Sequence, residues 1–281
     1  MITFEDYCRR KEEVAATVPI TGFRTVRQDP AVRALAAIGN RWTQCLFDGP
    51  FYRSRLNGDV PATSLVFVQS RDGNTVADNP SALGGGETDK HLIYEGLSRV
   101  DADAVMAGAT TARGERMIFS VWHPELVRLR ADLGRSRHPA QVVVTDRAEL
   151  VFERALMFQV PELRVVVITR SAMVPAVRQR LRLHPWVEVV DAGDPVSLTT
   201  AMRYLAASGV HVISAIGGRK TATALLRERL VSDVYLTTSA IEAGQPNTPF
   251  YEGSPPPLTQ VLEKEGQGRE TGVRFEHFLV R

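Results

Sequence analysis

Short apolar runs rich in β-branched residues alternate with amphipathic segments along most of the chain. The apolar runs predict strands at 64–69, 104–107, 141–145, 164–169, 187–190, 210–216, 234–238 and 275–280. Helical spacing falls at 88–100, 176–183, 198–208 and 221–229. This alternation predicts an α/β fold with a mostly parallel central sheet and helices on both faces. The last strand follows three prolines, 255–257, with no intervening helix, which predicts an antiparallel C-terminal edge.

The first 61 residues have a different pattern. A charged helix is predicted at 6–14 and a second helical segment at 30–38, before a turn-rich stretch at 47–50. The apolar positions here are too sparse for an independent core. We therefore predict an N-terminal extension, residues 1–61, that packs on a main domain of residues 62–281.

Composition excludes several classes of function. The 34 Lys and Arg nearly balance the 32 Asp and Glu, and the densest basic stretch, Arg135–His138, fits a solvated loop better than a nucleic-acid surface. Two cysteines and six scattered histidines predict neither a disulfide framework nor a metal site. The sequence has no apolar leader and no apolar run of membrane-spanning length, which favours a cytoplasmic protein that binds no membrane.

The strongest chemical signal lies where an apolar run, 210–216, gives way to a helix. Two glycines at this junction let backbone amides approach a ligand that a Cβ would obstruct, and the helix start favours an anion. The pattern predicts a phosphate cradle, although a tight turn without a ligand would have the same sequence. The candidate contacts are Gly217, Gly218, Arg219, Lys220, Thr221 and Ala222.

Three other strand ends carry polar groups. The strand at 104–107 is followed by a glycine, by Thr111 and by Arg113, a pattern that an N-capped helix would also produce. The strand at 141–145 ends at Thr145 and Arg147, and the strand at 64–69 ends in an Asp-Gly turn. Two phosphate-compatible turns in one sheet fit a dinucleotide. The Rossmann, P-loop and nucleophile-elbow motifs are missing from the sequence.

In this order, the segments resemble the reductase domain of the bifunctional riboflavin-biosynthesis deaminase–reductases, which has the dihydrofolate reductase fold. The resemblance covers about residues 62–281. Ser70–Gly73 is similar to the family's Ser-Leu-Asp-Gly turn, and Ala102–Arg113 is similar to its second strand and threonine turn. Thr111 and Glu115 fall on cofactor contacts, and Arg99 falls on an arginine that holds the substrate. Residues 217–222 resemble the glycine turn under the cofactor pyrophosphate.

The resemblance implies an NADPH-dependent reductase, similar to 5-amino-6-(5-phosphoribosylamino)uracil reductase, that acts as a homodimer on a small phosphorylated substrate. Asp72 is then the candidate acid, and cations at Arg113 and Arg147 with the Thr145 hydroxyl suit the 2′-phosphate of NADPH. The candidate substrate contacts are Ser70, Gly86, Arg99 and Ile216. The glycine-rich loop 84–86 is most simply a mobile connector, and its place before a predicted helix makes a lid over the site the alternative.

Two departures from the family leave alternatives open. Ile216 stands where the family usually has a glutamate that holds the pyrimidine, and an apolar side chain accepts no hydrogen bond. Another small imine or carbonyl substrate, or a nucleotide-binding protein without catalysis, is therefore an alternative. The deaminase domain is also missing from this chain, so deamination is not expected of it.

Overall fold

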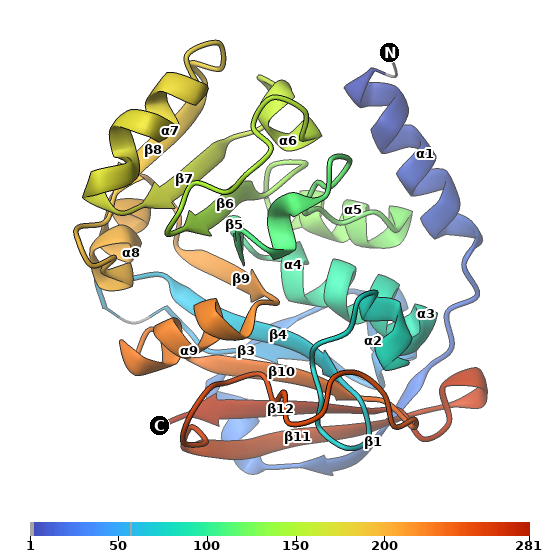
Figure 1. The fold of residues 1–281 in the computed structure, drawn as a ribbon. Coiled ribbons are helices and arrows are strands. Elements are labelled where there is room, and N and C mark those ends of the chain that lie inside the picture. The colour runs from blue at the N-terminus through green and yellow to red at the C-terminus, as the bar shows by residue number, and fades with distance from the viewer. Residues whose placement is uncertain (1–2, 57) are drawn as a thin grey trace.

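We describe a computed structural model that covers residues 3–56 and 58–281, in which ten strands form one sheet in the order β1-β11-β12-β10-β4-β9-β5-β6-β7-β8 (Figure 1). Residues 1, 2 and 57 of the predicted extension lie outside the described residues. Seven neighbouring strands are parallel: β4 (Ala62–Gln69), β5 (Ala104–Gly108), β6 (Ala140–Thr145), β7 (Val165–Thr169), β8 (Val187–Asp191), β9 (Val212–Ile216) and β10 (Asp233–Thr238).

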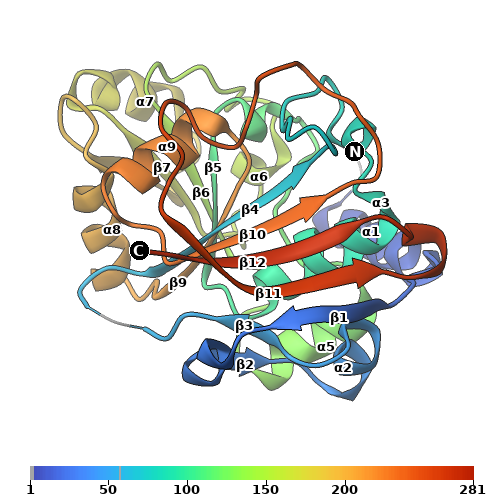
Figure 2. The same ribbon diagram turned by 90° about the horizontal axis from the view of Figure 1, so that it is seen from below.

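The remaining strands of the sheet are antiparallel. They are β1 (Phe23–Gln28), β11 (Leu258–Gly266) and β12 (Arg274–Val280), which lie side by side in Figure 2. The predicted mostly parallel sheet with an antiparallel edge is thus confirmed. The sequence patterns missed β11, and they missed β1, which forms the outermost strand. Both strands carry many charged residues, because each has one face toward solvent.

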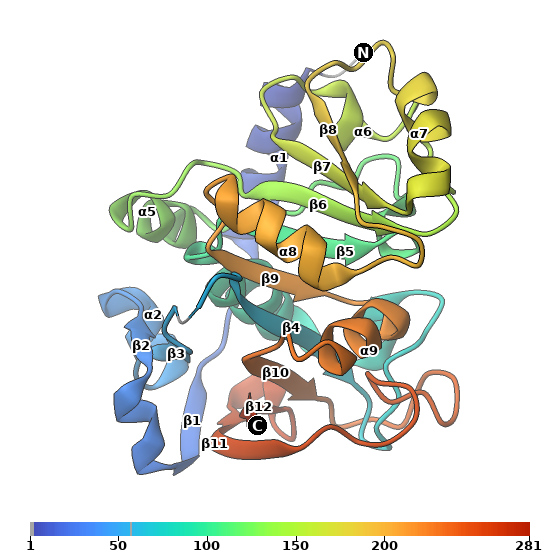
Figure 3. The ribbon, with the colours of Figure 1, turned by 90° about the vertical axis from the view of Figure 1, so that its left-hand side faces the viewer.

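Helices cover both faces of the sheet. One buried cluster joins the sheet to η3 (Asp89–Leu97), α5 (Pro124–Asp132), α6 (Leu156–Gln159) and α7 (Val174–Arg180). A second cluster, on the opposite face, joins it to α8 (Leu198–Ala207) and α9 (Arg219–Arg227), which stand in front of the sheet in Figure 3. None of the helices in the described residues is long and apolar enough to cross a membrane.

The helix predicted at 88–100 is a composite. It starts as α3 (Gly86–Thr88), continues as the π-helix η3 and ends as α4 (Ser98–Val100), with a non-helical backbone at Gly96. Four short 3₁₀ turns within the described part of the main domain are η2 (Pro80–Leu83), η4 (Thr111–Arg113), η5 (Ser171–Met173) and η6 (Gly268–Glu270).

The N-terminal segment is interlocked with the sheet. It contains α1 (Phe4–Thr17), β1, η1 (Pro30–Ala34), β2 (Ala36–Ile38), α2 (Arg41–Phe47) and β3 (Phe51–Arg53). The helix predicted at 30–38 is therefore wrong, because a 3₁₀ turn and a strand paired with β3 occupy that stretch.

Aromatic packing fixes this segment to the antiparallel strands. The ring of Phe47 lies 5.1 Å from that of Phe275, and the ring of Phe51 lies 4.6 Å from that of Tyr235. Lys264 of β11, 1% exposed, donates to Thr25 and lies over Phe47. The division of the chain at residue 61 stays a prediction, but these contacts show that the main sheet and the first 61 residues share one core.

Candidate active site

The carboxyl ends of the parallel strands share one edge of the sheet, with β9 among the central strands. β9 lies between β4 and β5. It is connected to β10 through α9 on one face of the sheet, whereas β4 is connected to β5 through η3 on the other face. The connections diverge at β9, and such a reversal is where open α/β sheets bind ligands. Gly108, at the end of β5, and Gly217, after β9, therefore lie at neighbouring turns of one edge.

The two glycines ahead of α9 are open to a ligand. Gly217 and Gly218 have φ angles of 56° and 80°, and Gly218 caps α9 without any side-chain hydrogen bond to the helix amides. A Cβ on Gly217 would lie 3.2 Å from Oγ1 of Thr111. A Cβ on Gly108 would lie 2.6 Å from Oγ1 of Thr221. The hydroxyls of Thr111 and Thr221 thus lie close to the turns at Gly217 and Gly108, beside backbone amides of α9 that no side chain caps. These donors together fit a pyrophosphate.

The cations predicted around this cradle have different surroundings. Arg219 donates through Nε to the carbonyl of Pro249 at 2.6 Å, so it anchors the segment before β11. Lys220 and Arg147 are exposed. Arg113 is paired at 3.0 Å with Glu149.

The other predicted cofactor contacts are placed as follows. Thr145 is 3% exposed at the end of β6, and Ala222 is packed in the core against the sheet. Glu115 is paired with Arg154 at 3.2 Å.

Asp72 belongs to a hydrogen-bonded turn. Ser70 donates to its carboxylate at 2.6 Å, and Asn74 Nδ2 donates to the other oxygen at 2.7 Å. These hydrogen bonds, chiefly that of Ser70, hold the pKa of Asp72 below its usual value of 3.8. A carboxyl group that is ionised at neutral pH has no proton to donate, which argues against the acid role.

A second carboxyl group at this edge was missed by the sequence analysis. Asp89 begins η3, is 3% exposed, and accepts a hydrogen bond from the hydroxyl of Thr237 near the end of β10. Burial raises the pKa of Asp89 to about 7 and Glu270 adds to the effect, whereas the hydrogen bond from Thr237 lowers the pKa. A substantial fraction of Asp89 is therefore protonated near neutral pH. An aspartate in the first turn of a predicted helix suggests only a surface position, so sequence gave no signal for it.

The loop of Gly84–Gly86 covers Asp89. A Cβ on Gly85 would lie 3.2 Å from Oδ2 of Asp89, and a Cβ on Gly84 would lie 2.7 Å from Ile241. Gly86, with φ of 81°, comes so close to Glu270 that a Cβ would lie 1.9 Å from its carboxylate. The glycines of this loop are thus needed for close packing over the buried carboxyl.

Two predicted substrate contacts are buried, and only Ile216, the last residue of β9, lies at this edge. Arg99, in α4 and 1% exposed, precedes β5 and donates to the carbonyl of Ser120 at 3.0 Å. It lies at the amino end of the strands, away from the glycine turn at Gly217 and Gly218. Ile216 is 1% exposed and packs in the cluster with η3. Burial leaves neither side chain available to a ligand in this structure.

The fold and this edge define a class of protein: α/β proteins whose mostly parallel sheet carries a glycine turn and a helix start at the carboxyl end of a central strand. The chain belongs to the family of the RibD C-terminal domain, whose model matches residues 61–268. These are riboflavin-type reductase domains with a dihydrofolate reductase-like fold, so the chain is assigned to the oxidoreductases.

Solved structures of the same type share the fold. A pyrimidine reductase-like protein from Corynebacterium diphtheriae is 24% identical, with a TM-score of 0.65 over 79% of this chain and 92% of that chain. RibD from Acinetobacter baumannii is 16% identical, with a TM-score of 0.62 over 79% and 58%. The riboflavin biosynthesis reductase Rib7 from Saccharomyces cerevisiae is 15% identical, with a TM-score of 0.58 over 81% and 93%. No curated protein sequence matches the chain.

Proposed function

We propose that this protein is an NADPH-dependent reductase of a small phosphorylated pyrimidine, of the kind that acts in riboflavin biosynthesis. The observation that carries the proposal is the cradle of Gly217, Gly218, Thr111 and Thr221 at the carboxyl edge. The family and the structures named above support the reaction type. The name of the yeast relative, a riboflavin biosynthesis reductase, supports the pathway.

The residues of the cradle would hold the cofactor pyrophosphate. Backbone amides at the start of α9 would donate to it, with the hydroxyls of Thr111 and Thr221 on either side. NADPH, when bound, supplies the hydride. Arg113, Arg147 and Thr145 would provide charge and a hydroxyl for the 2′-phosphate that distinguishes NADPH from NADH.

Asp89 would supply the proton. Reduction of a C=N or C=O bond adds a hydride to carbon and a proton to the heteroatom, and the second needs an acid that is protonated at working pH. Asp89 lies against β10, and β10 and β5 are three strands apart, roughly 14 Å at ~4.8 Å per strand. The cofactor arm and substrate would fill that distance. The loop of Gly84–Gly86 must shift to admit the substrate to Asp89.

The test is a direct comparison of the two cofactors. We expect NADPH to bind at least about tenfold more tightly than NADH, because a charge-assisted contact to phosphate contributes about 1.5–3 kcal/mol. Arg147→Ala should reduce that preference. Arg178→Ala, another exposed arginine, on α7, is the matched control and should leave it unchanged. Equal affinities for both cofactors in the wild type would refute the 2′-phosphate assignment.

A second substrate class is favoured by one observation. Ile216, a buried core residue, stands at the position where the family usually has a glutamate. The hydrogen-bond acceptor that the glutamate would offer to the edge of the pyrimidine is therefore missing. Another small imine or carbonyl compound is the alternative substrate. Turnover of the phosphoribosylaminouracil intermediate by the purified protein decides between them, since the alternative predicts NADPH binding without this turnover.

We also propose a cytoplasmic homodimer. β1 is an edge strand of the sheet, and its Val26 is 54% exposed. A second copy of the chain that packs on this edge would cover the apolar side chain. Light scattering on the purified protein measures the mass, and a monomer at micromolar concentration would contradict the proposed dimer.

A further inference from the structure

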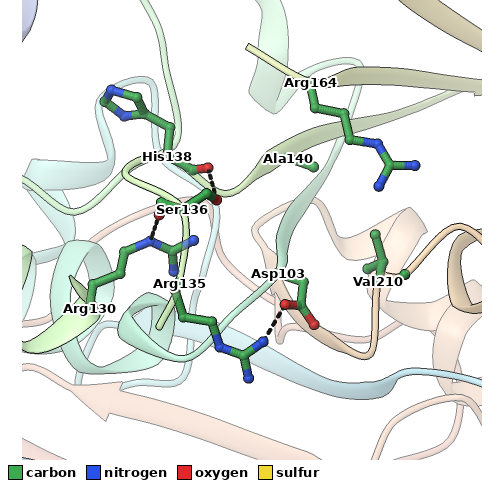
Figure 4. Close-up of a pocket in the computed structure, with 9 residues that line it drawn as sticks. Asp103, Arg130, Arg135, Ser136, His138, Ala140, Arg164 and Val210 are labelled. Atoms are coloured by element: carbon green, nitrogen blue, oxygen red, sulfur yellow. Dashed lines mark hydrogen bonds and ion pairs between the residues drawn. The ribbon is translucent and has the colours of Figure 1, made fainter. Parts of the chain in front are cut away.

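A polar cavity lies at the opposite edge of the sheet from the candidate active site (Figure 4). Its volume is about 190 Å³. Four of its lining residues, Asp103, Ala140, Arg164 and Val210, stand at the start of β5, β6, β7 and β9 or just before it. The amino ends of parallel strands share one edge, so the length of the strands separates this cavity from the glycine cradle.

Arg130, at the end of α5, is the buried cation of this cavity. It is 1% exposed, and its Nη1 donates to the carbonyls of Arg99 and Ala102, each at 2.8 Å. Its Nε donates to the carbonyl of Ser136 at 2.6 Å. Its Nη2 has no hydrogen-bond partner among the described residues. In Figure 4 the guanidinium points toward the space between the lining side chains.

The other two arginines of the cavity already have acidic partners. Arg135 pairs with Asp101 at 2.7 Å and also with Asp103. Arg164 pairs with Glu188 at 2.9 Å. None of the ion pairs within the described ranges includes Arg130, so it is the arginine of this cavity that has no carboxylate within ion-pair distance.

Asp103 and Asp101 are close enough to Arg130 to raise its pKa, but neither carboxylate forms a hydrogen bond or an ion pair with it among the described residues. The second oxygen of Asp103 accepts the backbone N–H groups of His211 and Val212 at 2.8 and 2.9 Å, so this carboxylate is fully engaged. Burial and the nearby arginines lower the pKa of His138 to about 4, which leaves its ring neutral. Burial lowers the pKa of Arg130 only to about 10, so the guanidinium stays charged at neutral pH.

We propose that this cavity binds a phosphate group, with the unpartnered Nη2 of Arg130 as its buried donor. A buried guanidinium without an anion is costly, and a bound oxyanion would offset that cost. Arginine is the side chain best suited to phosphate. The volume equals roughly six waters at ~30 Å³ each. That is room for a phosphate on a short stem, and it is below the ~300 Å³ at which sites for larger ligands begin.

This assignment changes the interpretation of the basic stretch Arg135–His138. Arg135, Ser136 and His138 all line the cavity, so the stretch is one wall of it rather than a solvated loop alone. The phosphate could be inorganic or belong to a phosphorylated metabolite, and the same donor would recognise both. Titrations with inorganic phosphate and with ribose 5-phosphate separate these sources.

The experiment is isothermal titration of the full chain with each probe at fixed ionic strength. Arg130→Gln removes the donor, and Ala140→Leu fills the cavity while leaving Arg130 in place. Thr221→Val is the matched control, because it alters the cradle at the other edge. We expect Arg130→Gln and Ala140→Leu each to weaken phosphate binding at least about tenfold and Thr221→Val to leave this binding unchanged.

Each outcome decides the proposal. If Arg130→Gln does not fold, Ala140→Leu alone carries the test. Tighter binding of ribose 5-phosphate than of phosphate assigns the site to a phosphorylated metabolite, and equal binding assigns it to inorganic phosphate. Phosphate binding that is lost in Thr221→Val and kept in Ala140→Leu would place the anion in the cradle and overturn the proposal. A wild type that binds neither probe would show a cavity that holds water only.

Discussion

Single residues at the start of α9 control how close a ligand can come. A Cβ on Gly218 would make only ordinary contact with Oγ1 of Thr111, at 3.6 Å, so the protein itself has room for it. The same Cβ would stand where an anion approaches the helix amides. Because φ at Gly218 is 80°, a residue with a Cβ would also strain the backbone there. The same strain would arise at a glycine with a positive φ that binds no ligand.

We therefore expect Gly218→Ala to weaken NADPH binding about ten- to a hundredfold, measured by fluorescence titration. The control is Gly134→Ala, because Gly134 has a similar φ of 70° and open space around its Cβ position. Both variants should lose about 1–2 kcal/mol of stability from strain. Equal NADPH affinities in the two variants would contradict the cradle.

The buried carboxyl of Asp89 makes a second prediction, on pH. Its pKa of about 7 in the folded chain lies above the ordinary value of 3.8, so the proton is present below pH 7 and lost above it. Turnover should therefore fall as pH rises through about 7. We expect Asp89→Asn to lower kcat by about 10²–10⁴ and to abolish this pH dependence. Asp72→Asn, the matched variant at the same edge, should keep the pH dependence of turnover.

The same shift has a separate consequence for stability. Between about pH 4 and pH 7 folded Asp89 binds a proton that the unfolded chain has released, so this group makes stability fall as pH rises through that window. Asp89→Asn should flatten the slope, which urea unfolding at several pH values measures. A variant that loses the stability slope but keeps wild-type turnover at every pH would show that Asp89 is buried without a part in proton transfer.

Among the elements, the contact between α3 and η6 determines how the Gly84–Gly86 loop is held. Gly86 begins α3 and Glu270 ends η6, and the Glu270 carboxylate also accepts the N–H of Thr88 at 3.3 Å. The close approach of this pair ties the loop to the turn between β11 and β12.

Gly86→Ala should destabilise the fold by about 1–3 kcal/mol, because the new Cβ overlaps Glu270 and the φ is positive. In a Glu270→Ala background the overlap is gone, so the same substitution should cost about 1 kcal/mol less. A double-mutant cycle of thermal unfolding measures this coupling. Strictly additive effects would show that backbone strain alone limits this position.

For the whole molecule, the N-terminal segment stabilises the antiparallel half of the sheet. Phe51, 2% exposed, packs on Tyr235 and Phe275 of the main sheet. Phe51→Ala should lower the free energy of unfolding by about 3–5 kcal/mol. Val14→Ala, at an exposed position of α1, should change it by at most about 0.5 kcal/mol. Similar urea midpoints for the two variants would mean that this segment folds independently of the sheet.

Local chemistry determined what the sequence could predict by itself. The strands predicted at 104–107 and 210–216 follow from β-branched and apolar runs, and the structure has them at 104–108 and 212–216. The turn at Gly217 and Gly218 follows from backbone freedom, which needs no distant partner. The cradle was predicted for this reason, and its binding of a phosphate stays a proposal. The strand at 258–266 was missed because a strand with one solvated face and many charges has no continuous apolar run.

Only the tertiary structure decided which polar side chains are buried. Asp89, Arg99 and Arg130 have ordinary surroundings in the sequence, yet each is at most 3% exposed once distant elements pack over it. That packing removes water and so sets the proton affinity of Asp89, buries Arg99 against the carbonyl of Ser120, and leaves Nη2 of Arg130 without a hydrogen-bond partner among the described residues. Desolvation depends on neighbours from far along the chain, and no local pattern of residues records them.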